Sequence, residues 1–413
     1  MKSDRTSRPK SRLLAFLFPA ALMVAGAAAP DQGGPMTRAE IRRQAADLTA
    51  LGRRLFMDPT LSASGELACA ACHSPAHGFG PPNALPVQLG GGTMGEPGTR
   101  AVPSLTYLQA SPSFTEHFFD SDDDGDESVD NGPTGGLTWD GRVDRGRDQA
   151  RIPLFSAYEM ANKDPAEAAG RIEKAGYGAA LRRILKAPLA EPDALVDAAA
   201  QAIEAYEQDY RSFYPYSSKY DAYLASKVAL SAAEARGLKL FEDPQKGNCA
   251  SCHLSQRSNN GAPPQFTDYG LIALGVPRNR AIPANRDPAH VDLGLCGPER
   301  TDFTDRADYC GRFKTPSLRN VALRQSFMHN GVFHSLREVM EFYVQRDTDP
   351  GKWYARKVDG TVDKFDDLPP AYRENVNTDP PFDRHPGDEP ALNAQEIDDV
   401  IAFLGTLTDA PKK

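Results

Sequence analysis

Apolar residues recur at the three- and four-residue spacing of an α-helix in several parts of the chain. After Thr37-x-x-Glu40, a capping box, the apolar positions from Ile41 to Leu55 fall on one helical face, and residues 193–213 form a second amphipathic run. The same capping pattern opens three further predicted helices, at Ser231-x-x-Glu234, Ser335-x-x-Glu338 and Asn393-x-x-Glu396. No convincing run alternates as strands do, so the pattern predicts a mainly α protein.

Part of this pattern is repeated. The segment GRRLFMDP at 52–59 resembles GLKLFEDP at 237–244, and VPSL at 102–105 resembles TPSL at 315–318. A chain of 413 residues is long enough for two domains. We therefore predict two related helical domains, residues 30–220 and 221–413, joined near residues 214–230.

The N-terminus has the composition of a targeting segment. Basic residues precede an apolar run from Leu13 to Ala29, and Ala25-Gly26-Ala27 is an A-x-A cleavage motif. We predict a signal peptide over residues 1–29 and a periplasmic protein with no membrane association after cleavage. The run is short for a membrane span, which needs about 20 apolar residues, and an uncleaved anchor is the alternative.

The net charge narrows the range of partners. The formal charge is −9. Removal of residues 1–29, with five basic residues and one acidic residue, brings it to about −13, which disfavours nucleic acid and anionic membranes as partners. Hydrophobic residues make up 40% and charged residues 25%, a composition typical of a folded globular protein.

Four of the six cysteines lie in two CxxCH motifs, CAACH at 69–73 and CASCH at 249–253. Two thiols at this spacing can add to the two vinyl groups of a haem, and the following histidine can ligate the iron. The alternatives are a zinc site built from two CxxC pairs and a redox dithiol, neither of which requires a histidine after each pair. We predict c-type haem attachment through Cys69, Cys72, Cys249 and Cys252, with His73 and His253 as iron ligands.

The chain resembles the bacterial di-haem cytochrome c peroxidases and their relative MauG over nearly its whole mature length. The resemblance rests on both CxxCH motifs, Thr138-Trp139-Asp140-Gly141-Arg142, Gln149, Pro153, Glu159-Met160, FKTPSLRNVAL at 313–323 and Met328-His329-Asn330-Gly331. It implies two cytochrome c-like helical domains, each with one covalent haem c, and a reaction with hydrogen peroxide.

The resemblance implies that peroxide reacts at the N-terminal haem. Other members block this iron with a loop histidine, but His77 is too close to His73 and the next histidine is His117, so we expect an open sixth position. Gln149 and Glu159 match the pair that faces it. A carboxylate there can move a proton between the peroxide oxygens while the amide orients them. The alternatives are a structural His77 and a surface position for Gln149 and Glu159.

The resemblance implies a different role for the C-terminal haem. In other peroxidases a methionine fourteen residues after the MHNG histidine is the sixth ligand, whereas this count from His329 reaches Tyr343, as in MauG. Phenolate favours higher oxidation states than thioether does. Met340 and, further away, Met328 are rival ligands, and Tyr343 could also be a core residue.

Trp139 matches the family tryptophan on the electron path, with a buried structural indole as the compatible alternative. The predicted activity is peroxide reduction with oxidising equivalents stored over both haems and electrons from a small cytochrome or another protein donor. The first alternative is a MauG-like oxidase that modifies side chains of a partner protein. The second, from another class, is a non-enzymatic di-haem electron carrier.

Two further features concern cross-links and metal. Cys296 and Cys310 would close a 15-residue loop as a disulfide, which export permits. The segment from Asp120 to Gly125 reads DSDDDG, the opening of a calcium loop, but position 12 is Asn131 rather than Glu. The stretch at 100–103 also lacks the asparagine that holds calcium in the family. Calcium is thus possible and unassigned, and a solvated acidic loop is the alternative.

Overall fold

The computed structural model describes residues 36–119 and 129–411. The chain divides into a short unit, residues 1–41, and a large one, residues 42–413. In the short unit the backbone N–H of Glu40 donates to Thr37 Oγ1 over 3.3 Å and that of Thr37 donates to Glu40 Oε2 over 2.8 Å, which confirms the predicted capping box. The predicted signal peptide and the segment 120–125 lie outside the described residues.

The described residues are mainly helical, as predicted. The α-helices are α1 (Arg38–Met57), α2 (Cys69–Cys72), α3 (Gly146–Phe155), α4 (Pro165–Lys174), α5 (Tyr177–Leu185), α6 (Pro192–Glu207), α7 (Tyr210–Phe213), α8 (Lys219–Leu224), α9 (Ala232–Glu242), α10 (Leu336–Gln345) and α11 (Ala394–Gly405). Two antiparallel pairs of two-residue strands complete them: β1 (Leu89–Gly90) with β2 (Glu96–Pro97), and β3 (Leu271–Ile272) with β4 (Phe313–Lys314).

The predicted helix over 193–213 is interrupted. It consists of α6 and α7, and the chain leaves the helical conformation at Asp209, whose ψ is 102°. The Asp209 carboxylate accepts a hydrogen bond from the Ser212 hydroxyl over 2.8 Å. A short acidic side chain that bonds to its own neighbourhood in this way competes with the helical backbone, and the apolar periodicity does not report it.

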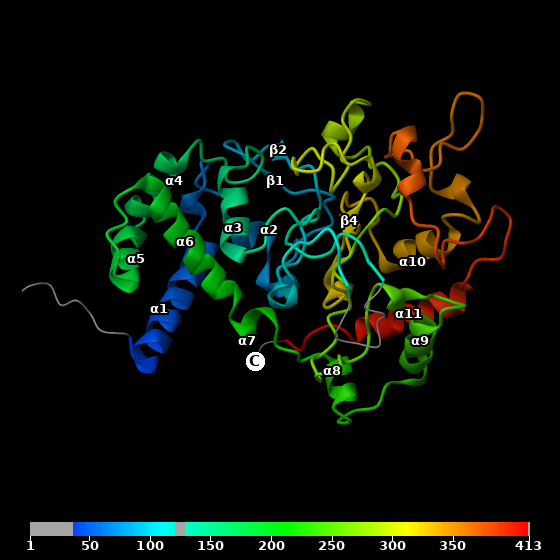
Figure 1. Ribbon diagram of the computed structural model, residues 1–413, viewed down its shortest axis with the longest axis horizontal. Helices are drawn as coiled ribbons and strands as arrows, with labels where there is room; N and C mark the ends of the chain where they lie inside the picture. Colours follow the sequence, from blue (N-terminus) through cyan, green and yellow to red (C-terminus); the bar gives the residue numbers. More distant parts are fainter. Residues whose placement is uncertain (1–35, 120–128, 412–413) are drawn as a thin grey trace, which may run out of the picture. The chain divides into compact units, whose positions relative to one another are not determined.

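The repeated sequence segment is also a repeat in packing. A Cβ atom added at Gly52 of α1 would lie 1.7 Å from the carbonyl oxygen of Ala202 in α6, and one added at Gly237 of α9 would lie 1.9 Å from that of Asp399 in α11. Only glycine permits such close helix crossings. Figure 1 shows α9 against α11 and, separately, α3, α4 and α6 together.

Two large clusters of buried apolar residues form the core. One draws its residues from Leu48 to Phe213, and the other from Tyr220 to Leu407. The predicted division into domains 30–220 and 221–413 stays a prediction. A third, smaller cluster surrounds Cys296 and Cys310, which are joined, so the predicted disulfide is confirmed.

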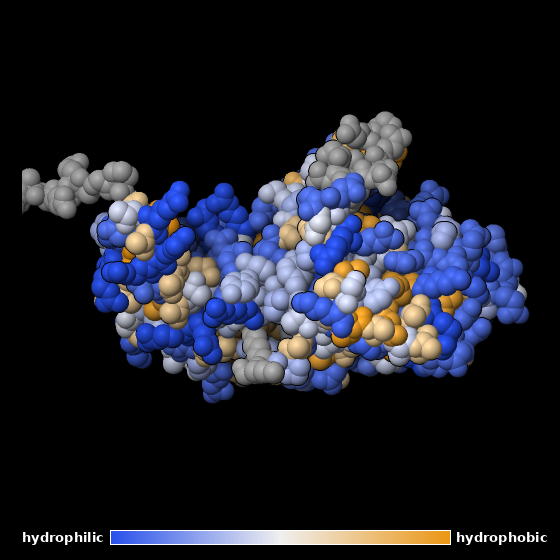
Figure 2. Space-filling view, turned by 90° about the horizontal axis from the view of Figure 1, so that it is seen from below, coloured by the Kyte–Doolittle hydropathy of each residue, from blue (hydrophilic) through white to orange (hydrophobic). Residues whose placement is uncertain are grey.

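Hydrophilic residues cover most of the face shown in Figure 2, and hydrophobic residues occupy smaller areas between them. Within the described ranges, no helix combines the length and apolar character that crossing a membrane requires.

Candidate active site

The residues predicted from the sequence line one cavity. It has a volume of about 730 Å³, and its walls include all six residues of the two motifs that were predicted to hold haem: Cys69, Cys72, His73, Cys249, Cys252 and His253. The same cavity is lined by Trp139, Gln149, Glu159, Met328, Met340 and Tyr343. Folding thus brings together residues that are up to 274 positions apart in the sequence.

The two motif histidines are oriented alike. His73 follows the single turn of α2, and its Nδ1 lies 3.1 Å from the carbonyl oxygen of Phe79; Nδ1 of His253 lies 2.9 Å from that of Phe266. A carbonyl only accepts, so each Nδ1 is the donor and each Nε2 carries the free lone pair. Burial lowers the pKa of both imidazoles to about 4, so both are neutral at pH 7.

The motif cysteines are free thiols. None of the four is in a disulfide. Burial raises the pKa of Cys69, Cys72 and Cys249 to about 12 and that of Cys252 to about 11, so they stay protonated at neutral pH. Paired thiols and a neutral imidazole on an apolar cavity wall are the donor set that a c-type haem requires. The residues of this cavity therefore fit the predicted group.

Gln149 and Glu159 line the cavity from α3 and from the turn that follows α3. Gln149 lies on α3, and after α3 the chain turns back, with the N–H of Glu159 donating to the carbonyl of Ser156 over 3.0 Å. Burial raises the pKa of Glu159, and the carboxylate of Glu299 adds to this effect while Arg142 opposes it. A carboxyl group with a raised pKa is suited to exchange protons near neutral pH.

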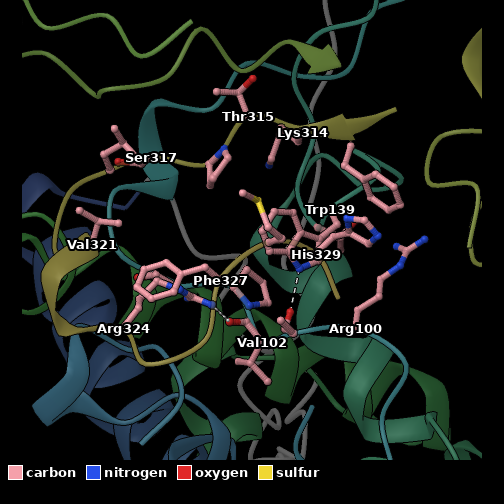
Figure 3. Close-up of a pocket in the computed structure, with 18 of the residues that line it drawn as sticks. Arg100, Val102, Trp139, Lys314, Thr315, Ser317, Val321, Arg324, Phe327 and His329 are labelled. Atoms are coloured by element: carbon pink, nitrogen blue, oxygen red, sulfur yellow. Dashed lines mark hydrogen bonds between the residues drawn. The ribbon is translucent and has the colours of Figure 1, made fainter. Parts of the chain in front are cut away.

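Trp139 is held from both halves of the chain. Its indole Nε1 donates to the carbonyl of Ala101 over 2.7 Å, and its own carbonyl accepts from the N–H of Lys314 over 2.7 Å. Figure 3 shows Trp139 close to His329 and Lys314 in the cavity wall. The first half therefore holds the indole of Trp139, and the second half holds its backbone.

The neighbouring Asp140 carries the charge that secures this wall. Its side chain is fully buried and accepts hydrogen bonds from Arg100 Nη1 over 2.6 Å, from Arg142 Nη1 over 2.7 Å and from Thr138 Oγ1 over 2.6 Å. Arg100 also binds Asp292, with 2.6 Å between its Nε and Oδ2. The arginines keep the pKa of Asp140 below its ordinary value although burial alone would raise it.

Tyr343 and Met340 both reach the cavity from α10. The helix begins after Ser335, whose hydroxyl accepts from the N–H of Glu338 over 3.2 Å, as its capping pattern predicts. The Tyr343 ring lies 5.2 Å from that of Phe382, and its hydroxyl has no hydrogen-bond partner among the described residues. Met340 is buried in the second core cluster. The choice between the two ligands stays a prediction.

Three other histidines, His77, His117 and His329, differ in position. His117 binds Asp130 through Nδ1, has a side chain that is 67% exposed and is not among the cavity residues. His77 follows His73 by four residues, and its Nδ1 lies 3.0 Å from the Ser74 hydroxyl. His329 lines the cavity and stacks on Phe313, with ring centroids 3.6 Å apart.

Sequence reasoning missed some charged residues of the cavity wall, among them Arg324, Asp292 and Glu299. Arg324 directly follows the apolar residues VAL at 321–323, and that position was the available signal. Asp292 precedes Cys296, and Glu299 lies within the loop closed by the Cys296–Cys310 disulfide; nothing near them in the sequence indicates that they face the cavity.

The fold and the cavity place this chain in the class of the di-haem cytochrome c peroxidases. The family model described as "Di-haem cytochrome c peroxidase" matches residues 46–229. The methylamine utilization protein MauG of Paracoccus denitrificans is 32% identical over 407 residues, which cover 96% of this chain and 95% of that protein. Cytochrome c551 peroxidase of Pseudomonas aeruginosa is 28% identical over 70% of this chain and 69% of its own.

A solved structure supports the same class of protein. The diheme peroxidase BthA of Burkholderia thailandensis matches with a TM-score of 0.74 and 42% identity, over 88% of this chain and 86% of that chain. The chain belongs to the di-haem cytochrome c peroxidase and MauG family, which confirms the predicted resemblance. It is a MauG-like di-haem peroxidase, hence an oxidoreductase with haem cofactors.

Proposed function

We propose that this protein is an exported peroxidase that reduces hydrogen peroxide at its N-terminal haem with electrons from another protein. The observation that carries the proposal is the single cavity, whose walls include both CxxCH motifs, Trp139, the pair Gln149 and Glu159, and Tyr343. The signal peptide predicted over residues 1–29 would direct the chain to the periplasm.

Each haem would be attached within its own predicted domain, one in residues 30–220 and one in 221–413. The S–H bond of each motif cysteine would add across a vinyl group, with the sulfur bonding to one carbon and the hydrogen going to the other. Nε2 of His73 and of His253 would ligate the irons. Calcium stays possible and unassigned, because the DSDDDG segment lies outside the described residues.

When bound, the haems supply the iron at which peroxide reacts and hold the oxidising equivalents. Glu159 takes a proton from the near peroxide oxygen and returns it to the leaving oxygen, and Gln149 orients the peroxide. Trp139, bonded to both halves of the chain, is the redox-active side chain of the wall. Tyr343 would ligate the second iron through its phenolate, which favours higher oxidation states than a thioether.

This proposal has two forms, which differ in the source of the electrons. A small cytochrome would make the protein a hydrogen peroxide reductase, and the acidic net charge of −9 favours a basic partner. A side chain of a partner protein would make it a modifying oxidase, which the 32% identity to MauG favours. A non-enzymatic carrier gives no reason for Gln149 and Glu159 in the cavity.

We predict two covalent haems on the mature protein. The mass of the purified protein should exceed that of the chain by two haem groups, and Cys69→Ser with Cys72→Ser should remove one of them. Replacement of both Cys296 and Cys310 by serine is the matched control and should leave both adducts. Fewer than two adducts on correctly matured wild-type protein would contradict covalent attachment.

We predict a high-spin ferric haem in the resting protein, because no blocking histidine follows His73 at a useful distance. His117, the next candidate, is bound to Asp130 outside the cavity. Absorption and electron paramagnetic resonance spectra should show high-spin iron, and hydrogen peroxide should react without prior reduction. A purely low-spin spectrum together with inertness to peroxide would favour the electron carrier.

We predict that Glu159→Gln slows the reaction with peroxide about 10²–10⁴-fold while both haems stay attached, because acid–base assistance is lost. Stopped-flow spectroscopy measures this rate. In the wild type the rate should fall as the pH drops through the pKa of Glu159, which burial raises above its ordinary value. The exposed Glu374→Gln is the control. An unchanged rate in Glu159→Gln would make Glu159 structural.

We predict that Tyr343→Phe raises the reduction potential of the second haem and shortens the lifetime of the spectral change that peroxide produces. The reason is loss of phenolate ligation. Met340→Leu, on the same helix and also at the cavity wall, is the matched comparison and should do neither. If Met340→Leu altered both properties and Tyr343→Phe left them unchanged, the second iron would have His/Met ligation.

A further inference from the structure

Five cationic side chains among the described residues line the cavity: Arg100, Arg142, Lys314, Arg319 and Arg324. Three of them bind carboxylates: Arg100 and Arg142 bind Asp140, and Arg319 binds Asp221. Lys314 Nζ donates to the carbonyl of Gly136, and Asp140 is close enough to raise its pKa against the effect of burial. Three of the five cations are therefore paired with carboxylates, and Lys314 has the Asp140 carboxylate nearby, although burial still lowers its pKa to about 8.

Arg324 is the exception. It follows a 3₁₀ turn, Val321–Leu323, and its Nη2 donates to the carbonyl of Val102 over 3.0 Å while Nε donates to that of Ser326 over 3.2 Å. Within the described part of the chain, it has no carboxylate partner, and its Nη1 group has no hydrogen-bond partner. Figure 3 shows the side chain extended along the cavity toward Val102.

Such a cation is costly to bury. Moving a charge out of water costs several kcal/mol unless an opposite charge compensates it, and backbone carbonyls provide only partial compensation. Burial accordingly lowers the pKa of Arg324 to about 10, with no acidic group to oppose the effect. The arrangement is complementary to an anion that enters the cavity, one carboxylate oxygen of which would accept from Nη1.

The position of Arg324 indicates which anion this is. Arg324 is close enough to His73 to lower the pKa of that imidazole, and the position of a Cβ on Gly80 would be 3.5 Å from Nη1. The carbonyl of Phe79, next to Gly80, accepts the bond from His73 Nδ1. Arg324 thus lies beside the turn that orients His73, and a haem held by His73 would bring two propionate carboxylates as the anions that this arginine could bind.

We propose that Arg324 binds a propionate of the haem at His73 and sets the reduction potential of that haem. The proposal rests on the proposed function, which supplies the haem at this motif. Arg324 is a positioning residue here, since it acts on the iron through charge. A paired propionate leaves no net negative charge near the iron, whereas an unpaired one stabilises the ferric state.

The test is spectroelectrochemical titration of both haems in the full mature protein. Arg324→Gln should lower the potential of the His73 haem so that its ferric-to-ferrous ratio at fixed applied potential rises about tenfold, a shift of about 59 mV for one electron. Arg324→Lys keeps the charge and should stay close to the wild type. The potential of the His253 haem should change less in both variants.

Arg356→Gln is the matched control. Arg356 also donates to a backbone carbonyl, that of Gly360 over 2.9 Å, but it is exposed and is not a cavity residue. It should leave both potentials unchanged. If Arg324→Gln lowered only the unfolding temperature, or if Arg324→Lys shifted the potential as much as Arg324→Gln, the propionate assignment would be wrong and Arg324 would only connect residues 102 and 326.

A measurement on the wild type keeps the proposal testable if Arg324→Gln does not mature. Resonance Raman bands of the propionates of the His73 haem should shift between H₂O and D₂O, because the N–H donors exchange. Bands that do not shift would overturn the proposal. Loss of the proposed function would look different, since the wild type would then lack a haem at Cys69 and Cys72 or would not react with peroxide.

Discussion

The buried carboxylate of Asp140 connects the segments on which the cavity depends. Arg100 and Arg142 bind it from two sides, Arg100 continues to Asp292, and Arg300 Nη1 donates to the Asp140 carbonyl over 2.8 Å. Removing one partner of a buried ion pair commonly costs 3–5 kcal/mol, because the other charge stays buried alone. Segments around residues 100, 140 and 300 are thereby joined across the sequence, and Trp139 is positioned as part of them.

The two halves of the chain share one kind of helix crossing and differ in the side chains that they contribute to the cavity wall. In each half a glycine allows two helices to cross closely, at Gly52 with α6 and at Gly237 with α11. The chemistry comes from segments outside this repeat. The turn after α3 supplies Glu159 in the first half, while α10 supplies Tyr343 and Met340 in the second. One helical framework thus carries two cavity walls with different side chains.

Charged side chains of both signs line the cavity: among the described residues, Arg100, Arg142, Lys314, Arg319 and Arg324 face it together with Glu159, Glu207, Asp292, Glu299, Asp367 and Asp379. The protein is acidic, with a net charge of −9, yet arginines and a lysine line the cavity and most of them are neutralised by internal carboxylates. Arg324 has no carboxylate partner among the described residues, and the proposed haem propionate would supply one.

The sequence by itself determined the features that depend on local spacing. The cysteines and histidines at 69–73 and 249–253, the caps at Thr37 and Ser335, and the family resemblance all follow from neighbouring residues, because attachment and capping need groups a few positions apart. The repeated glycines could also be read from the chain. The interruption of the predicted helix at Asp209 could not, since the periodicity of apolar residues does not report a side chain that bonds to its own turn.

Only the tertiary structure decided which charges meet. Arg100 and Asp292 are separated by 192 residues, and the carbonyl that Arg324 binds is separated from it by 222 residues. Spacing carries no information about such pairs, because they form only when loops from both halves fold against the same cavity. Met340 and Tyr343 are a contrasting case. The helix pattern predicts both on one helix, and both reach the cavity wall. Position along the chain does not distinguish Met340 from Tyr343 as a ligand, because ligation depends on contacts across the cavity and on bond chemistry.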